Sequence, residues 1–406
     1  MSNDQRYVES LRAALTGSLA DQGALSSEAV VAAFRTVPRH LFVPDAPVEV
    51  AYADDVVLMK RDEAGVPISS VSQPSLVALM LEQTGVRRGH RVLEIGSGGY
   101  NAALLSELVG PEGEVTTIDI DPDVTERARA TLDAAGYERV RVARTDGQFG
   151  YPESAPFDRI IVTVTAGDIA PAWVDQLADG GRIVVPLRLR GQTRSIGFDL
   201  ERSPGSAGVL WSRSSVVCGF VSMQGAGAAH ERLVEIEPDK VALQLDADQV
   251  LEAVLLPGVL RETPEVRWSR VLLGREESFC QLDLWLASVF PGYCVLTATR
   301  RAVKSRLVRP ALRWGGSAVV RDATIGYLTS QPGPTKNAVE IGARAHGPDA
   351  RRLAEELVAQ VLRWDEERRG RPDPVFVVHP LGTPATDLPA GPHFTTRSRV
   401  ITVLWD

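Results

Sequence analysis

The fold is decided by a short glycine-containing stretch in the first quarter of the chain, Val92-Leu93-Glu94-Ile95-Gly96-Ser97-Gly98-Gly99-Tyr100. Its apolar residues are typical of a buried strand, and its glycines allow a tight turn into a helix expected over Asn101–Val109. Such strand-to-helix turns bind ligands in open α/β sheets. The stretch therefore predicts an α/β, Rossmann-like, doubly wound fold with a cofactor at this turn.

Strand and helix patterns alternate after this turn, and helical patterns precede it. Expected strands are Arg91–Ile95, Glu114–Ile120, Val140–Ala143, Phe157–Val164 and Arg182–Pro186, with two more near Gly197 and Val216. Expected helices are Arg6–Leu19, Glu28–Thr36, Leu76–Gln83 and Pro122–Ala135, besides Asn101–Val109. Apolar strands that alternate with helices predict a parallel sheet covered on both faces.

The pattern changes after about residue 222, where Gly225-Ala-Gly-Ala-Ala is typical of a linker. Beyond it we expect a helix, Pro348–Arg369, and the strands Phe279–Leu286, Tyr293–Ala298, Ala318–Leu328, Val375–His379 and Val400–Trp405. We predict a catalytic domain over residues 1–224, made of N-terminal helices (1–85) and a cofactor-binding sheet (86–224). A C-terminal α+β domain is expected over residues 225–406.

Composition narrows the class of protein. The 406 residues carry a formal charge of −8, which argues against a nucleic-acid partner. No apolar run is long enough to span a membrane, and the N-terminus lacks a signal core. The three cysteines show no metal-ligand spacing, so we expect a cytoplasmic protein without a metal site.

Two kinds of cofactor compete for the glycine turn. A dinucleotide site requires a third glycine where this chain has Asn101, and Glu94 would repel a pyrophosphate. S-adenosylmethionine has no phosphate and carries a sulfonium and an ammonium, which suit an acidic residue beside the turn. We therefore expect S-adenosylmethionine, with S-adenosylhomocysteine as the product, in place of a nicotinamide cofactor.

Further acidic residues follow the next two strands. Asp119 ends the second strand, where a carboxylate can accept the ribose hydroxyls. Asp146-Gly147 follows the third strand, at the edge where an adenine ring would lie. Glu94, Asp119 and Asp146 are thus expected at the carboxyl ends of successive parallel strands, which favours a methyltransferase.

These residues resemble the protein L-isoaspartyl O-methyltransferases. The likeness runs through Val37–Pro44, Ser72–Leu76, Leu93–Gly98, Asp146-Gly147, Ala155–Thr163 and Leu177–Pro186, in the order of the family. The resemblance implies a carboxyl O-methyltransferase. It also implies that the cofactor is bound by Glu94, Gly96, Ser97, Gly98, Asp119, Asp146, Gly147 and Thr163.

The chain departs from repair enzymes of this family in three places. Ser72-Gln73-Pro74-Ser75 replaces Ser-Ala-Pro-His, the glycine loop is one residue shorter, and ordinary repair enzymes are expected to lack the C-terminal domain. By resemblance Ser72 lies at the reacting carboxylate as the catalytic residue. Gln73 and Ser75 are candidate substrate-binding residues.

The departures resemble a subgroup that tailors ribosomally made peptides, either lanthipeptides or graspetides. By that resemblance the substrate is an aspartate side chain in a modified precursor peptide, recognised by residues 225–406. The methyl ester would then close to a succinimide (aspartimide), which can open to isoaspartate. Two alternatives remain: a repair enzyme for isoaspartyl proteins, and a non-catalytic scaffold that binds a peptide.

Overall fold

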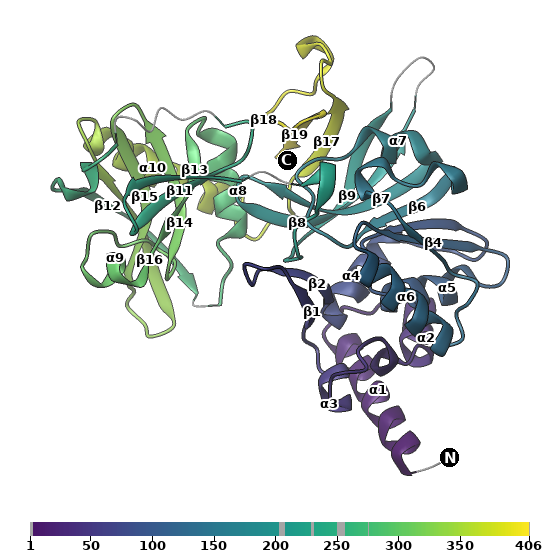
Figure 1. The fold of residues 1–406 in the computed structure, drawn as a ribbon. Coiled ribbons are helices and arrows are strands. Elements are labelled where there is room, and N and C mark those ends of the chain that lie inside the picture. The colour runs from purple at the N-terminus through teal and green to yellow at the C-terminus, as the bar shows by residue number, and fades with distance from the viewer. Residues whose placement is uncertain (1–2, 203–207, 229–230, 250–255, 275, 406) are drawn as a thin grey trace.

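The structure is a computed structural model that describes residues 3–202, 208–228, 231–249, 256–274 and 276–405. Figure 1 shows two bodies beside each other, one formed by the purple-to-teal half of the chain and one by the green segment. Ala229, the last residue of the expected linker, lies outside the described residues.

The first body begins with helices and a hairpin and continues into an alternating α/β unit. Its elements are α1 (Asn3–Asp21), α2 (Glu28–Thr36), α3 (Val48–Ala51), β1 (Val57–Arg61), β2 (Pro67–Val71), α4 (Pro74–Thr84), β3 (Arg91–Ile95), α5 (Tyr100–Val109), β4 (Glu114–Asp119), α6 (Pro122–Ala134), β5 (Arg141–Arg144), β6 (Phe157–Val162), α7 (Pro171–Gln176), β7 (Leu177–Leu189), β8 (Gln192–Glu201) and β9 (Val209–Val217).

The second body is followed by three strands that end the chain. Its elements are β10 (Arg232–Glu237), β11 (Val241–Leu245), β12 (Glu265–Gly274), α8 (Cys280–Val289), β13 (Tyr293–Ala298), α9 (Arg300–Lys304), β14 (Gly315–Arg321), β15 (Thr324–Pro332), β16 (Ala338–His346) and α10 (Ala350–Glu367). The last strands are β17 (Val375–Pro380), β18 (His393–Thr395) and β19 (Arg399–Leu404).

A ten-stranded sheet in the order β18-β19-β17-β9-β8-β7-β6-β3-β4-β5 organises the first body. Strands β5, β4, β3, β6 and β7 are parallel, so the carboxyl ends of β3, β4 and β6 meet at one edge. Three apolar residues of β3, Val92, Leu93 and Ile95, are fully or almost fully buried. The predicted Rossmann-like methyltransferase fold is confirmed.

Local features of the sequence explain where three of the helices begin. The Ser27 hydroxyl accepts the backbone N–H of Val30 at the start of α2. Pro74 and Pro122 occupy the first turns of α4 and α6, where a missing N–H costs nothing.

The second body is a seven-stranded sheet in the order β10-β11-β13-β14-β15-β16-β12, with antiparallel pairing throughout. The long helix α10 packs against β12, β15 and β16. Its buried stripe contains the residues predicted from helical spacing, Leu353, Leu357, Val361 and Trp364.

Two expected strands of this body were wrong. Phe279–Leu286 alternates like a half-buried strand but forms helix α8, because Leu282, Trp285 and Leu286 are buried together at helical spacing. Ala318–Leu328 is two strands rather than one, since the chain reverses at Asp322, where φ is +49°.

The last strands return to the first body. Strand β17 pairs with β9, so residues 375–404 extend the ten-stranded sheet rather than the second body in which the sequence placed them. The reason is non-local: the buried strand β17 satisfies its backbone at the open edge of β9. The role of residues 225–406 in peptide recognition stays a prediction.

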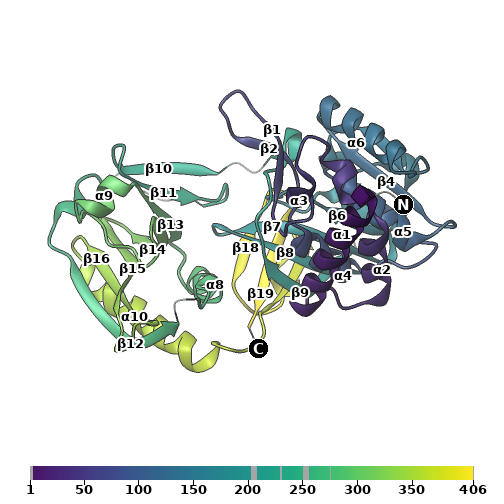
Figure 2. The ribbon, with the colours of Figure 1, turned by 90° about the horizontal axis from the view of Figure 1, so that it is seen from below.

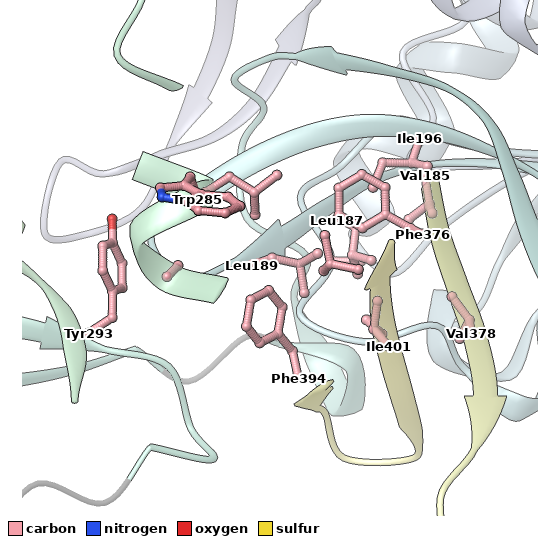
Figure 3. Packing of buried hydrophobic residues seen from close by; sticks show 14 of the residues in the cluster. Val185, Leu187, Leu189, Ile196, Trp285, Tyr293, Phe376, Val378, Phe394 and Ile401 are labelled. Carbon is pink, nitrogen blue, oxygen red and sulfur yellow. The ribbon is translucent and has the colours of Figure 1, made fainter. Parts of the chain in front are cut away.

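The two bodies share one apolar core. Figure 3 shows Leu189 of β7, Phe394 of β18 and Trp285 of α8 converging on it. Figure 2 shows α8 between the second sheet and strands β18 and β19. The buried guanidinium of Arg194 on β8 also joins them, because it pairs with Asp373 at 2.7 Å and donates to the Cys280 carbonyl at 3.1 Å.

Among the described residues, no helix is long and apolar enough to cross a bilayer.

Candidate active site

An inner cavity lies at the carboxyl edge of β3, β4 and β6. It is lined by Ile68, Ser69, Ser70, Val71, Ser72, Val77, Met80, Glu94, Gly96, Ser97, Gly98, Tyr100, Asn101, Asp119, Ile161, Thr163, Val164, Phe220 and Val221. Seven of the eleven residues that the sequence singled out are among them: Ser72, Glu94, Gly96, Ser97, Gly98, Asp119 and Thr163. These seven residues come from four separate segments, and the parallel pairing of β3, β4 and β6 brings three of the segments together.

Glu94 is a buried carboxylate in the wall of this cavity. Its Oε1 accepts Asn101 Nδ2 at 2.7 Å, and its Oε2 accepts the Thr117 hydroxyl at 2.6 Å. Burial raises the pKa of the Glu94 carboxyl to about 7, against the lowering effect of these two hydrogen bonds. A cation bound nearby would stabilise the ionised form.

The glycine turn is held against the neighbouring strands. The Thr163 hydroxyl donates to the carbonyl of Gly96 at 2.7 Å, and Gly96 has a φ of +97° that favours glycine. The Ser97 N–H donates to Asp119 Oδ2 at 3.0 Å. Burial raises the pKa of the Asp119 carboxyl, and backbone N–H donors partly offset that effect.

Asp146 and Gly147 occupy different surroundings. Gly147 lines a small cavity that adjoins the inner one and shares Gly96 and Asp119 with it. The Asp146 carboxylate accepts the N–H groups of Gln148 at 2.9 Å and Ala226 at 2.8 Å. Asp146 lines neither cavity. Its hydrogen bonds instead connect the turn after β5 to segment 225–227.

Strand β2 of the β1–β2 hairpin forms one wall of the inner cavity. Lys60 on β1 pairs with Asp121 at 2.7 Å and with Asp123 at 2.6 Å, which fastens the hairpin to α6. The cavity measures only about 50 Å³, well below the roughly 300–1,000 Å³ of typical ligand sites.

An outer groove of about 830 Å³ lies on the other face of the hairpin. It is lined by Val56, Leu58, Arg61, Val66, Pro67, Ser70, Ser72, Gln73, Ser75, Leu76, Leu79, Val216, Val217, Cys218, Gly219, Phe220, Val221 and Ser222. Four residues line both the groove and the inner cavity: Ser70, Ser72, Phe220 and Val221. Atoms held in the two spaces can therefore meet at Ser72.

Backbone contacts fix the segment that carries Ser72. The buried Arg39 donates from Nη2 to the Ser72 carbonyl at 2.9 Å and from Nε to the Ala51 carbonyl at 2.8 Å. Asp54 accepts the Ser75 N–H at 2.8 Å and the Gln73 amide at 3.3 Å. No described residue bonds to the Ser72 hydroxyl, whereas the Gln73 amide is already engaged.

Sequence reasoning missed several residues of the site. Arg39 lies within the motif Val37–Pro44 without a predicted role, and Asn101 was considered only as a departure from a dinucleotide pattern. Asp54, Thr117 and segment 220–222 gave no local signal, because long-range contacts bring them in. The hairpin did leave a signal, the apolar run Val56–Met59 followed by a turn around Gly65.

The first half of the chain is similar to known proteins. The family model described as protein-L-isoaspartate(D-aspartate) O-methyltransferase matches residues 10–208. The protein-L-isoaspartate O-methyltransferase of Ignicoccus hospitalis is 41% identical over 181 residues, which are 44% of this chain and 83% of that relative. The protein of the same description from Opitutus terrae is 44% identical over 180 residues, covering 44% of this chain and 73% of its own.

The fold likeness extends into the second body. A solved structure described as a protein-L-isoaspartate O-methyltransferase covers 91% of this chain and 96% of its own, with a TM-score of 0.50 and 24% identity. Coverage of 91% necessarily includes most of residues 225–406. The expectation that proteins of this description lack such a domain is therefore wrong for that structure.

The motifs, the inner cavity and the relatives agree. The chain belongs to the protein-L-isoaspartate O-methyltransferase family and is an S-adenosylmethionine-dependent carboxyl methyltransferase.

Proposed function

We propose that the chain methylates a carboxylate oxygen of an isoaspartyl residue in a protein or peptide that lies in the outer groove. The observation that carries this proposal is the meeting of groove and inner cavity at Ser72. The names of the relatives support isoaspartate as the residue.

The inner cavity offers groups that fit the cofactor. Two buried polar atoms there, Ser97 Oγ and Asn101 Oδ1, have no hydrogen-bond partner among the described residues. Glu94 would face the cationic part and Asp119 would accept ribose hydroxyls, while Gly96, Ser97 and Gly98 form the backbone cradle. Thr163 supports the cradle and Gly147 lines the far end, while Asp146 only holds the turn that carries Gly147.

When bound, S-adenosylmethionine supplies an electrophilic methyl group. A substrate carboxylate, with a reference pKa of about 4, is already ionised at neutral pH, so the protein needs no general base. Ser72 donates one hydrogen bond that holds the reacting oxygen without neutralising it. Positioning and water exclusion of this kind are worth up to about 7–11 kcal/mol.

The lining of the outer groove fits a carboxylate that must be held without being neutralised. Hydroxyl groups of Ser70, Ser72, Ser75 and Ser222 line it, together with apolar side chains such as Leu76 and Val216. A strong ion pair would weaken the nucleophile, and Arg61 is the one charged side chain among the described lining residues.

Cofactor affinity should depend on pH through Glu94. The carboxyl is protonated in the free protein below about pH 7, and a cationic cofactor lowers its pKa. Affinity for S-adenosylmethionine should therefore rise with pH and level off above about 7, falling by up to about tenfold per unit below it. Calorimetric titration between about pH 6 and about pH 8.5 measures this.

Glu94→Gln is the matched control for that titration. The amide oxygen of Gln can still accept from Asn101, and its amide N–H can donate to the Thr117 hydroxyl oxygen. Unlike Glu94, the Gln side chain does not titrate. The variant should bind more weakly at high pH and lose the part of the pH dependence due to Glu94. An unchanged profile in the variant would assign the dependence to the cofactor's own amino group.

A second candidate substrate is an aspartate side chain in a ribosomally made precursor peptide, of lanthipeptide or graspetide type, that becomes a succinimide. Its support is the serine at position 75, where the resemblance leads one to expect a histidine. Ser75 lines the groove, so the smaller side chain widens the substrate side.

Matched peptides separate the two candidates. One peptide carries isoaspartate and one aspartate at the same position, and any short modified peptide encoded beside the gene is assayed with them. We expect kcat/KM to be at least about tenfold higher for isoaspartate, the effect of one lost charge-assisted contact. Methylation of the encoded precursor alone would establish the tailoring role instead, and methylation of none would reject both.

A further inference from the structure

The outer groove contains one positive charge. Its other described lining residues are apolar, hydroxyl-bearing, amide, thiol or glycine residues, whereas Arg61 carries a guanidinium at the end of β1. The whole chain has a formal charge of −8. The groove therefore carries a local positive charge on a protein whose net charge is negative.

Arg61 is exposed, and no carboxylate among the described residues pairs with it. Its Nη1 donates to the Gly65 carbonyl at 2.7 Å, which orients the guanidinium at the hairpin turn. Asp62 and Glu63 follow in that turn, but Asp62 accepts the Val66 N–H, and neither lines the groove. Within the described ranges Arg61 forms no ion pair, unlike its neighbour Lys60.

The hairpin register sets the distance between this charge and the reacting centre. Arg61 pairs with Pro67, and β2 then runs to Val71 and on to Ser72. Five residues of extended chain at about 3.3 Å each span about 16 Å. A substrate in extended conformation covers the same distance in about five residues, and the arginine side chain shortens the gap by one or two.

We propose that Arg61 is a specificity-determining residue that selects peptides with a second carboxylate, about three to five residues from the methylated one. This inference rests on the proposed function, because it assumes that the methylated residue sits at Ser72. Arginine suits the role, since its planar fork pairs with a carboxylate through two N–H groups. The second carboxylate belongs to an aspartate or glutamate side chain of the same peptide.

A series of peptides with a glutamate at successive positions, called the acid walk below, tests the proposal. The parent peptide is the one methylated best in the matched assay, and it has no charged side chain other than the methylated carboxylate. A single glutamate is placed at each position in turn on both sides of the methylated residue. Glutamine at each position is the reference, so the readout is the ratio of kcat/KM for the two peptides. Native enzyme, Arg61→Gln and the control Arg300→Gln are compared, because Arg300 is an exposed arginine of α9 outside the groove.

For the native enzyme and Arg300→Gln, the ratio should peak at about two- to fivefold at an offset of about three to five residues on one side. The peak should shrink with added salt and vanish in Arg61→Gln. A flat walk in the native enzyme, or a peak that survives in Arg61→Gln, overturns the inference while leaving the proposed function intact. Absence of methylation on every peptide rejects the proposed function and this inference with it.

Discussion

Ser72→Ala lowers kcat/KM for the peptide substrate by about tenfold to a hundredfold, which corresponds to one hydrogen bond to a charged group at about 1.5–3 kcal/mol. Ser72 lines both the inner cavity and the outer groove, and its hydroxyl has no hydrogen-bond partner among the described residues. Its removal leaves the contacts of Arg39 and Asp54 intact, because both hold the backbone or neighbouring residues. Steady-state kinetics with the matched peptides measures the loss.

Two controls separate a loss of substrate positioning from a loss of cofactor binding. S-adenosylhomocysteine affinity should change by less than about threefold, since the lost hydrogen bond goes to the substrate. Ser72→Thr keeps a hydroxyl and should recover most of the activity. Loss of cofactor binding together with activity in Ser72→Ala would show that the residue acts through the cavity wall.

Gly96→Ala should weaken cofactor binding by at least about thirtyfold if the chain remains folded. A Cβ at this position would lie 2.7 Å from Thr163 Oγ1 and 3.0 Å from Val164 Cγ1, and the φ of +97° disfavours any other residue. The left-handed backbone costs about 1–2 kcal/mol, and overpacking adds about 1–3 kcal/mol. The loop must shift, which displaces the Ser97 N–H from Asp119. Calorimetry with S-adenosylhomocysteine reads the effect.

Gly136→Ala is the matched control for backbone strain. Gly136 also has a positive φ of +83°, but its Cβ would meet nothing within 4 Å. That variant should lose stability in thermal unfolding while binding the cofactor normally. Equal losses of affinity in both variants would mean that strain alone, rather than the contact with Thr163, governs the cradle.

Local patterns were sufficient for the alternating α/β unit. Strand β3 and its glycine turn were predicted because apolar runs and glycines report on neighbours in sequence. The acidic residues could be placed too, because the ends of parallel strands necessarily meet at one edge. Glu94 and Asp119 do line the same cavity.

Long-range contacts account for what the sequence could not show. The partner of β17 is an edge strand more than 150 residues earlier, and no local pattern specifies such a pairing. Arg39 and Asp54 act on the backbone of a distant segment, so their side chains carry no motif of their own. Helix α8 was missed because its first residues alternate by chance, while its buried stripe begins only at Leu282.

The most direct test of the account is to locate the transferred methyl group by tandem mass spectrometry after incubating the enzyme with S-adenosylmethionine and the isoaspartyl peptide. The account predicts one methyl group on the carboxylate of the isoaspartyl residue, lost as methanol in mild base with closure to a succinimide. A methyl group on nitrogen or on a hydroxyl, stable to base, would contradict carboxyl transfer at Ser72.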